Sequence, residues 1–482
     1  MRIAYIAAGA GGLYCGACAR DLALLRALRA AGHEVLVVPL YTPLRADAPV
    51  GLPMSPLFFG GISTYLRQAS KWFGYLPGVG RKLLDHPGLL RLVSRRAIQT
   101  DPRALGPLTV SMLSGAAGPQ AREAQRLADF LAQDFRPDVV HITNSLLIAL
   151  APILRERLTG SSTGGAGGGG EAYSGGGRAL IFCTLQGEES FLAALPEAYR
   201  QQAVAWCRQH AAAVDGFIAC AQERVAPLAE LLRVAPERIS VVLSGLDAAP
   251  YQSDREPIPP GEPRNVTAIP QTEDQSAEIT IGYLSPIRRV KGLDVLLEAV
   301  HRLVAEDAGG DGEAGRKGRR IRLAIAGQIL EPDYEKELRQ TIRRYGLEKI
   351  VTWRGELSLA EKVTFLHGCD VFVLPTRQAE SRAMAVMEAL AAGVPVIASG
   401  LGILPELLTD TGGGITVPPE DPAGLAAALT AWRDHPAQAA AIGRQGAAAL
   451  ATRYTPPRMA AATLAVYQQV WQRVLASGPQ SR

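Results

Sequence analysis

This chain has few of the features that mark a membrane-spanning, nucleic-acid-binding or disulfide-stabilised protein. No apolar run reaches the roughly 18 residues that a transmembrane helix needs. The net charge is only +4 over 482 residues, so a nucleic-acid partner is not indicated. Six cysteines without regular spacing are typical of a reducing compartment. We therefore expect a cytoplasmic protein.

Metal ligands are equally scarce. Cys15 and Cys18 form a single CxxC beside an expected helix start, where the pKa of a thiol can fall. A zinc site needs a second ligand pair at a suitable spacing, and the sequence offers none. No thioredoxin-like context supports a redox role, so we expect both cysteines to be small buried packing residues.

Alternating strand and helix patterns predict an α/β protein with parallel sheets covered on both faces by helices. A length of 482 residues exceeds one ordinary core, which favours two domains. The first series begins with RIAYIAA, a glycine loop and the helix CARDLALLRALRAAG, and continues through HEVLVVPL, DVVHIT, ALIFCTL, GFIACA and ISVVLSG. The second series comprises ITIGYL, RLAIAG, IVTWRG, DVFVLP, VPVIAS and GITVPP.

The domain boundaries follow from segments that lack periodicity. Residues 251–278 are polar and rich in proline, which predicts an interdomain linker. Glycine-rich stretches at 160–177 and 309–319 indicate flexible insertions. We predict an N-terminal domain over 1–250, a C-terminal domain over 279–455, and a closing helix over 456–476 that packs back on the N-terminal domain. Because ligands bind at the carboxyl ends of such strands, we expect a site between the domains.

The most informative segment is PTRQAESRAMAVMEALAAGVPVIASGLGILPE, residues 375–406. It places Glu380 and Glu388 with seven residues between them, the second inside a helical pattern of small residues. A helix start offers unpaired backbone N–H groups to a phosphate. A carboxylate about two turns further on lies roughly 12 Å along the axis. This spacing suits a nucleotide sugar; the alternative is two surface glutamates on an alanine-rich helix.

These residues resemble glycosyltransferase family 4, the retaining enzymes with the GT-B fold. The similarity rests on Glu380–x7–Glu388 with ALAAGVPVIAS, GILPELL and GGGITVPPED, and on IGYL, VKGLDVLLEA, RLAIAG, VTWRGEL and CDVFVLPT in the family's order. GAGGLYCGACARDLALLRALRAAGHEVLVVP resembles the family's opening strand, glycine loop and helix. The resemblance implies two Rossmann-like, doubly wound parallel-sheet domains that face each other across a cleft.

The resemblance also implies a nucleotide-diphosphate sugar as co-substrate, with no metal or cofactor required. Glu388 would accept hydrogen bonds from the ribose hydroxyls, and Glu380 from a hydroxyl of the donor sugar. The distal phosphate would contact backbone N–H groups of Ser381, Arg382, Ala383 and Met384. Gly11 and Gly12 would let the backbone approach the diphosphate closely. Their loop does not match GxGxxG, which disfavours a nicotinamide cofactor.

Lys291, in VKG, is the implied cation on the leaving diphosphate, where a fixed positive charge stabilises the negative charge that develops. Relatives often carry an arginine five or six residues earlier, where this chain has Ser285 and Pro286. We expect Arg288 to take that role, whereas Arg289 has a solvated surface position as its alternative.

His141 ends the strand DVVH, in a region where the family often has two histidines two residues apart. Thr143 occupies the second place. His141 is therefore either a catalytic residue of the cleft or a histidine satisfied at a strand end. On the acceptor side we place Asn144, Gln186 and Glu188, with a charge at a helix N-terminus as the alternative for Glu188.

Ala383 stands where the family usually has glycine. If this position requires a positive φ, alanine costs stability or moves the phosphate contact. If the helix has already begun there, alanine is harmless. Residues 58–96 interleave aromatic and basic side chains, a pattern that suits an anionic membrane or a lipid-linked acceptor. Ordinary helices with inward-facing aromatics are the alternative.

We therefore predict a retaining glycosyltransferase that moves a hexosyl group from a nucleotide-diphosphate sugar to a hydroxyl of a saccharide, lipid or small molecule. It would act in the cytoplasm, with peripheral contact at the inner membrane face as an option. Thr143, Pro286 and Ala383 motivate the alternative of a noncatalytic nucleotide-sugar-binding GT-B protein. Another GT-B enzyme, such as a sugar-nucleotide epimerase, is a further alternative.

Overall fold

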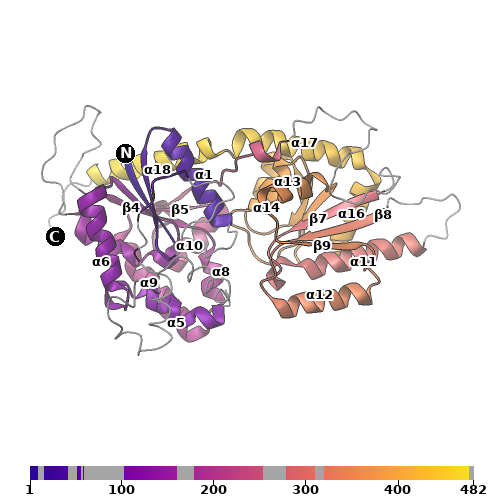
Figure 1. Cartoon of the computed structure of the whole chain (residues 1–482), viewed down its shortest axis with the longest axis horizontal. Helices are drawn as coiled ribbons and strands as arrows, with labels where there is room; N and C mark the ends of the chain where they lie inside the picture. The colour runs from indigo at the N-terminus through magenta and orange to yellow at the C-terminus, as the bar shows by residue number, and fades with distance from the viewer. Residues whose placement is uncertain are drawn as a thin grey trace. The chain divides into compact units, whose positions relative to one another are not determined.

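The computed structural model describes residues 1–8, 16–41, 51–55, 58, 102–159, 178–252, 278–309 and 320–476. The chain divides into two compact units (Figure 1). Unit 1 comprises Met1–Gly245 and Pro456–Arg482, and unit 2 comprises Leu246–Thr455. Each unit contains a six-stranded sheet whose paired strands run parallel.

The sheet of unit 1 has the strand order β2-β1-β3-β4-β5-β6. Its strands are β1 (Arg2–Ala7), β2 (Glu34–Pro39), β3 (Val139–Ile142), β4 (Leu180–Leu185), β5 (Gly216–Ala219) and β6 (Ile239–Val241). The helices are α1 (Gly16–Ala30), α5 (Pro102–Leu113), α6 (Ala121–Phe130), α7 (Leu150–Leu158), α8 (Glu188–Ala193), α9 (Glu197–His210), α10 (Val225–Leu232) and α18 (Pro456–Ala476). They lie on both faces of the sheet, as a doubly wound fold requires.

Alternation along the strands builds the two cores of unit 1. Ile3 and Tyr5 of β1 pack on one face with α1 and α18, whereas Ala4 and Ile6 pack on the other face with α6, α7 and α9. Successive side chains of a strand point to opposite faces. Because both faces are covered, the strand reads as a continuous apolar run.

The closing helix α18 belongs to unit 1. It packs along α1, and Tyr467 and Val470 are buried in the same core as β1. The helix thus joins a sheet whose strands precede it by more than two hundred residues in the sequence.

Unit 2 has the strand order β12-β11-β10-β7-β8-β9. Its strands are β7 (Glu278–Leu284), β8 (Arg320–Ala326), β9 (Val351–Gly355), β10 (Val371–Leu374), β11 (Val396–Ser399) and β12 (Gly414–Val417). The helices are α11 (Leu293–Gly309), α12 (Pro332–Arg344), α13 (Leu359–His367), α14 (Met384–Ala391), α15 (Leu404–Thr411), α16 (Pro422–Asp434) and α17 (Pro436–Arg453). Two doubly wound parallel sheets were predicted from the sequence, and this prediction is confirmed.

The boundary between the two units lies slightly before the expected one. The division falls after Gly245 rather than at residue 250, and Tyr251 is only 3% exposed within unit 2. A tyrosine ring carries a large apolar area and a hydroxyl that needs a hydrogen-bond partner, and Tyr251 has both inside unit 2, where its hydroxyl donates to Glu388. Residues 253–277 and 160–177 lie outside the described part of the chain.

Among the described residues, no helix combines the length and the apolar character that crossing a bilayer demands. Within 58–96 only position 58 is described, so the membrane or lipid contact expected there stays a prediction.

Candidate functional site

The strand order of unit 2 reverses between β7 and β10, which are neighbours in the sheet although β8 and β9 separate them in sequence. Because the strands are parallel, the loops that follow β7 and β10 leave the same edge of the sheet. Open α/β sheets form their ligand sites at such a reversal of strand order. Lys291 lies in the first loop and Glu380 in the second.

Lys291 and Glu380 form an ion pair, with the lysine Nζ donating to Oε1 of the glutamate. Their side chains are 20% and 17% exposed, so both charges remain within reach of solvent. The two residues were predicted to act on the same donor, and the structure brings them together. The two opposite charges therefore neutralise each other at this edge of the sheet.

Two glycines allow the backbone to hold this pair. Gly292 has φ +70°, and a Cβ there would lie 1.8 Å from the carbonyl oxygen of Pro375. Gly402 has φ +68°, and a Cβ there would lie 2.2 Å from the carbonyl oxygen of Glu380. An L side chain would therefore force the loops apart and adopt a strained conformation. The N–H of Ile403 also donates to the Glu380 carbonyl at 2.8 Å.

Ala383 precedes α14 as its N-cap and adopts φ 50° and ψ 33°. The position therefore does use the left-handed conformation, which costs an L-residue about 1–2 kcal/mol. Its side chain makes no capping hydrogen bond. Backbone N–H groups of the first helical turn lack intrahelical partners, so the start of α14 has the polarity expected for an anion contact.

Glu388 is buried within α14, with 3% exposure. Its Oε1 accepts a hydrogen bond from Lys362 Nζ at 2.8 Å and from the Tyr251 hydroxyl at 3.0 Å. The Lys362 and Glu388 side chains are each 4% exposed. The alternative of a surface glutamate is therefore wrong for Glu388, whose carboxylate is held by a buried cation and a phenol.

Arg288 and Arg289, which precede Lys291, pair with acidic residues at α12. Glu331 lies directly before this helix and Glu337 lies within it. Arg288 Nε donates to Glu331 Oε1 at 3.2 Å. Arg289 pairs with Glu337 and lies over the ring of Tyr334, and its side chain is 53% exposed. The surface position is the better description of Arg289, and the donor role of Arg288 stays a prediction.

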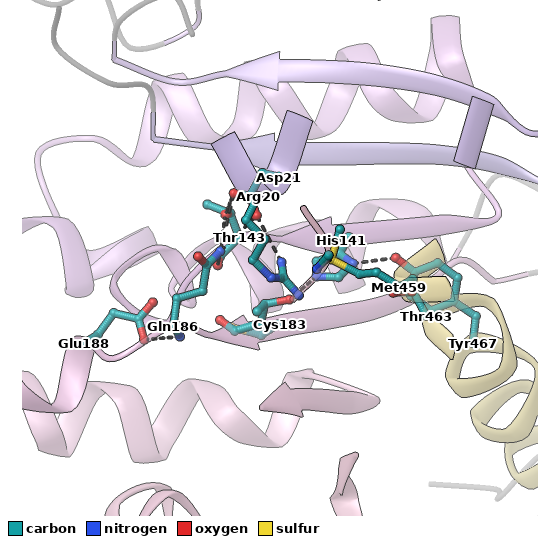
Figure 2. A network of polar contacts seen from close by, with 12 residues as sticks. Arg20, Asp21, His141, Thr143, Cys183, Gln186, Glu188, Met459, Thr463 and Tyr467 are labelled. Carbon is teal, nitrogen blue, oxygen red and sulfur yellow. Dashed lines mark hydrogen bonds and ion pairs between the residues drawn. The ribbon is translucent and has the colours of Figure 1, made fainter. Parts of the chain in front are cut away.

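In unit 1, His141 lies on β3 and is 0% exposed. Its Nδ1 is hydrogen-bonded to the hydroxyl of Tyr467 on α18 (Figure 2), and its Nε2 to the hydroxyl of Thr184 on β4. Both ring nitrogens are thus occupied inside the core. This arrangement favours the alternative of a satisfied strand histidine over a residue that contacts substrate.

A second polar cluster lies at the carboxyl ends of β3 and β4. Asp21 of α1, 2% exposed, accepts hydrogen bonds from Arg20 Nη1 at 3.1 Å, from Gln186 Nε2 at 3.1 Å and from the Thr143 hydroxyl. Figure 2 shows these side chains converging from the helix and from the two strand ends. Arg20 is 1% exposed and forms a buried ion pair with the adjacent Asp21.

Asn144 and Glu188, two further acceptor-side candidates, accept hydrogen bonds from backbone N–H groups close to them in the sequence. The Asn144 side chain accepts from the N–H of Leu146 at 3.1 Å and caps a short 3₁₀ helix. Glu188 is the first residue of α8, and its Oε2 accepts from the N–H of Gln186 at 2.8 Å. Gly11 and Gly12 lie outside the described residues.

Sequence reasoning overlooked Asp21, Lys362 and Tyr251. Two of them carried a usable signal. Asp21 precedes the buried Leu24, Leu25 and Leu28, and Lys362 precedes the buried Phe365 and Leu366. A charge that shares the i, i+3, i+4 spacing of an apolar stripe is directed at the core, where it requires a partner.

In the part of the chain that the structure describes, no three His, Cys, Asp or Glu side chains are grouped so that they could hold a metal ion. The five described cysteines, Cys18, Cys183, Cys207, Cys220 and Cys369, are all buried thiols.

The fold and the C-terminal site agree with one class of protein. Residues 267–448 match the family model described as "Glycosyl transferases group 1". The matched segment covers most of unit 2 and includes Lys291, Glu380 and Glu388. Unit 2 is therefore similar to this family over most of its length.

Two curated relatives illustrate the sequence similarity. Glycogen synthase of Mycobacterium tuberculosis is 28% identical over 255 residues, which cover 52% of this chain and 54% of that protein. D-inositol 3-phosphate glycosyltransferase 2 of Catenulispora acidiphila is 27% identical over 262 residues, 53% of this chain and 56% of that protein. The chain thus spans about half the length of the curated relatives that it matches.

Solved structures support the GT-B fold across the whole chain. Anabaena HepE in complex with UDP and glucose superposes with a TM-score of 0.63 at 16% identity, covering 98% of this chain and 99% of the other. The catalytic domain of starch synthase IV from Arabidopsis thaliana, bound to ADP and acarbose, gives a TM-score of 0.64 at 14% identity over 98% and 99% of the two chains. At these identities the similarity establishes the fold.

The strained Ala383 gives a first test. We expect Ala383→Gly to leave the free energy of unfolding unchanged or to raise it by about 0.5 kcal/mol, because relief of the left-handed strain outweighs the extra entropy of the unfolded chain. Ala389→Gly, in the interior of the same helix, should lower it by at least about 1 kcal/mol. Urea unfolding of both variants measures the difference, and an equal loss in the two would contradict the assignment of strain.

Burial of His141 gives a second test. Loss of hydration in the core and the nearby charge of Arg20 lower the pKa of His141 to about 3, whereas an unfolded histidine titrates near 6.5. Between these values only the unfolded state binds the proton, so stability is complete above about pH 6.5 and falls as the pH drops below it.

His141→Gln removes this titration. We expect the wild type to lose about 1.4 kcal/mol more than the variant between pH 7.5 and pH 5.5, as measured by urea unfolding. The other histidines are present in both proteins, so they cancel in the comparison. Parallel pH dependences for the two proteins would show that the pKa of His141 is the same in the folded and unfolded states.

Proposed function

We propose that this protein is a retaining glycosyltransferase that moves a hexosyl group from a nucleotide-diphosphate sugar to a hydroxyl acceptor. The observation that carries the proposal is the Lys291–Glu380 ion pair at the strand reversal of unit 2, inside a segment that matches the glycosyltransferase group 1 model. A cation and a carboxylate at the carboxyl edge of a doubly wound sheet suit a ligand with a charged diphosphate and a neutral polyol.

The donor would lie along the start of α14 and the loop before α11. Its distal phosphate would accept hydrogen bonds from the backbone around Ser381–Met384, and its diphosphate would attract Lys291. The sugar hydroxyls would donate to Glu380, and the ribose hydroxyls to Glu388. Arg288 is a second cation for the same diphosphate.

We infer that donor binding exchanges partners within the ion pair. Without a donor, Lys291 and Glu380 satisfy each other. With a donor bound, the ammonium turns to the diphosphate and the carboxylate accepts from the sugar. The ammonium then stabilises a leaving group whose negative charge increases as the glycosidic bond breaks.

In the proposed reaction the acceptor oxygen attacks the anomeric carbon from the face that the diphosphate leaves. The bond from that carbon to the diphosphate oxygen breaks, a bond to the acceptor oxygen forms, and the acceptor proton passes to the departing diphosphate. The anomeric configuration is retained and no metal takes part.

For the acceptor we propose a saccharide, a lipid-linked saccharide or a small molecule, selected by unit 1, and we propose cytoplasmic action. Among the acceptor-side candidates, Gln186 donates to Asp21, as the Thr143 hydroxyl also does. We assign His141 a structural role in the core, because both of its ring nitrogens are bonded there.

The activity is tested by screening UDP-, ADP- and GDP-hexoses for thermal stabilisation and for slow release of free sugar. With the active donor, we expect Lys291→Ala to lower kcat by roughly 10²–10³-fold, because it removes charge stabilisation of the transition state. Glu388→Gln should weaken donor binding by roughly tenfold or more. Glutamine is chosen because its amide oxygen can still accept from Lys362 Nζ and from the Tyr251 hydroxyl, so that loss of the negative charge is the main change.

Glu298→Gln serves as the control, since Glu298 makes an exposed pair with Arg302 on α11. Glu298→Gln should leave kcat and the dissociation constant of the donor unchanged. Binding without turnover, over a broad acceptor panel, would replace the enzyme by a noncatalytic nucleotide-sugar-binding protein. An inverted anomer in the product, read by NMR, would reject the retaining mechanism, and release of an epimerised nucleotide sugar would identify an epimerase.

A further inference from the structure

Arg377 lies between β10 and Glu380, in the second of the two loops that form the candidate donor site. Its backbone N–H donates to the carbonyl of Val290 at 2.8 Å. Its Nη1 donates to the carbonyl of Arg289 at 2.8 Å. Arg377 therefore binds the two residues that immediately precede Lys291, although it belongs to the loop that carries Glu380.

The same guanidinium also binds the residues that follow Lys291. Nη1 and Nη2 donate to Oδ1 and Oδ2 of Asp294 at 2.7 and 2.8 Å. This bidentate contact fixes both the distance and the orientation of the two side chains. Asp294 lies in the first turn of α11, directly after the Lys291–Gly292 turn. Nε donates to Glu420 Oε1 at 2.8 Å, which fixes the guanidinium plane on its other edge.

Asp294 is held from its far side by α12. The Tyr334 hydroxyl donates to Asp294 Oδ1 at 2.5 Å and accepts from the Asp294 N–H at 3.1 Å. Burial alone would raise the pKa of Asp294, but the hydrogen bonds from Arg377 and Tyr334 outweigh it and lower the pKa. The carboxylate thus stays ionised as the partner of Arg377.

We propose that Arg377, with Asp294 and Tyr334, is a positioning device that sets the distance between Lys291 and Glu380. Its hydrogen bonds go to the backbone before Lys291, to the helix after it and to Glu420. It acts on the ion pair through the two loops, and no contact with the donor is required. The inference rests on the proposed donor role of Lys291 and Glu380.

A fixed geometry matters here because the ammonium must meet charge that develops during bond breaking. A displacement of about 1 Å in such a group can cost roughly 10²-fold in rate. Lysine cannot replace the arginine fully, since an ammonium lacks the planar fork that binds both carboxylate oxygens. The full positioning effect therefore requires an arginine at this position.

The test compares Arg377→Gln and Arg377→Lys with Arg322→Gln. Arg322 of β8 pairs with Glu278 of β7 at 2.8 Å, and its side chain is 24% exposed against 23% for Arg377. It is a matched arginine at the amino ends of the strands, away from the site. With the most active of UDP-, ADP- and GDP-glucose, we expect Arg377→Gln to lower kcat at least tenfold, with the dissociation constant of the donor changed less than threefold.

Arg377→Lys should keep an intermediate kcat, and Arg322→Gln the wild-type value. The double variant Arg377→Gln/Asp294→Asn should lose no more kcat than Arg377→Gln alone, because each change removes the same contact between Arg377 and Asp294. Wild-type kcat in Arg377→Gln, or fully additive losses in the double variant, would overturn the proposal.

Amide hydrogen exchange provides a readout that needs no turnover. Arg377→Gln should speed exchange at least tenfold in both 289–294 and 376–381, relative to segments of unit 1, whereas Arg322→Gln should affect neither. Unchanged exchange in these two segments would overturn the positioning role. If the wild type turns over no nucleotide sugar, the proposed function fails, while exchange still decides whether Arg377 couples the two loops.

Discussion

The candidate site depends on the close approach of two backbones at the carboxyl edge of one sheet. At Gly292 the loop after β7 comes so near the carbonyl of Pro375 that a Cβ would lie 1.8 Å from its oxygen. At Gly402 a second contact of this kind fixes the backbone of Glu380. These contacts bring the backbones of Lys291 and Glu380 close enough for the two side chains to meet. Backbone contacts of this kind tolerate change in the surrounding side chains while they exclude any Cβ at the two glycines.

Local sequence patterns predicted the elements of both sheets, because buried parallel strands read as short apolar runs and the helices between them carry a regular apolar stripe. The same patterns placed Glu380 and Glu388 around α14. The patterns did not predict which residues bind these side chains. Glu388 meets Tyr251 across 137 residues, and Arg377 meets Asp294 across 83 residues. Such pairs depend on how helices and loops pack on a sheet, and no local pattern encodes that.

The conformation of Ala383 was left open for a related reason. Whether a residue caps a helix in the left-handed region or already belongs to its first turn depends on how the preceding loop enters, and here that loop is bound to Gly402 and Ile403. The burial of Tyr251 was not predicted, because composition averages over a segment and does not show that one aromatic ring within it is packed.

The position of α18 has a consequence for how the chain folds during synthesis. Tyr467 and Val470 complete the apolar core that β1 and α1 begin, so this face of the first unit stays partly uncovered until α18 has been synthesised. Contacts of such large sequence separation form slowly, and exposed apolar surface favours aggregation in the meantime. The second unit, made from one continuous stretch of sequence, can complete its own core earlier than the unit whose synthesis begins first.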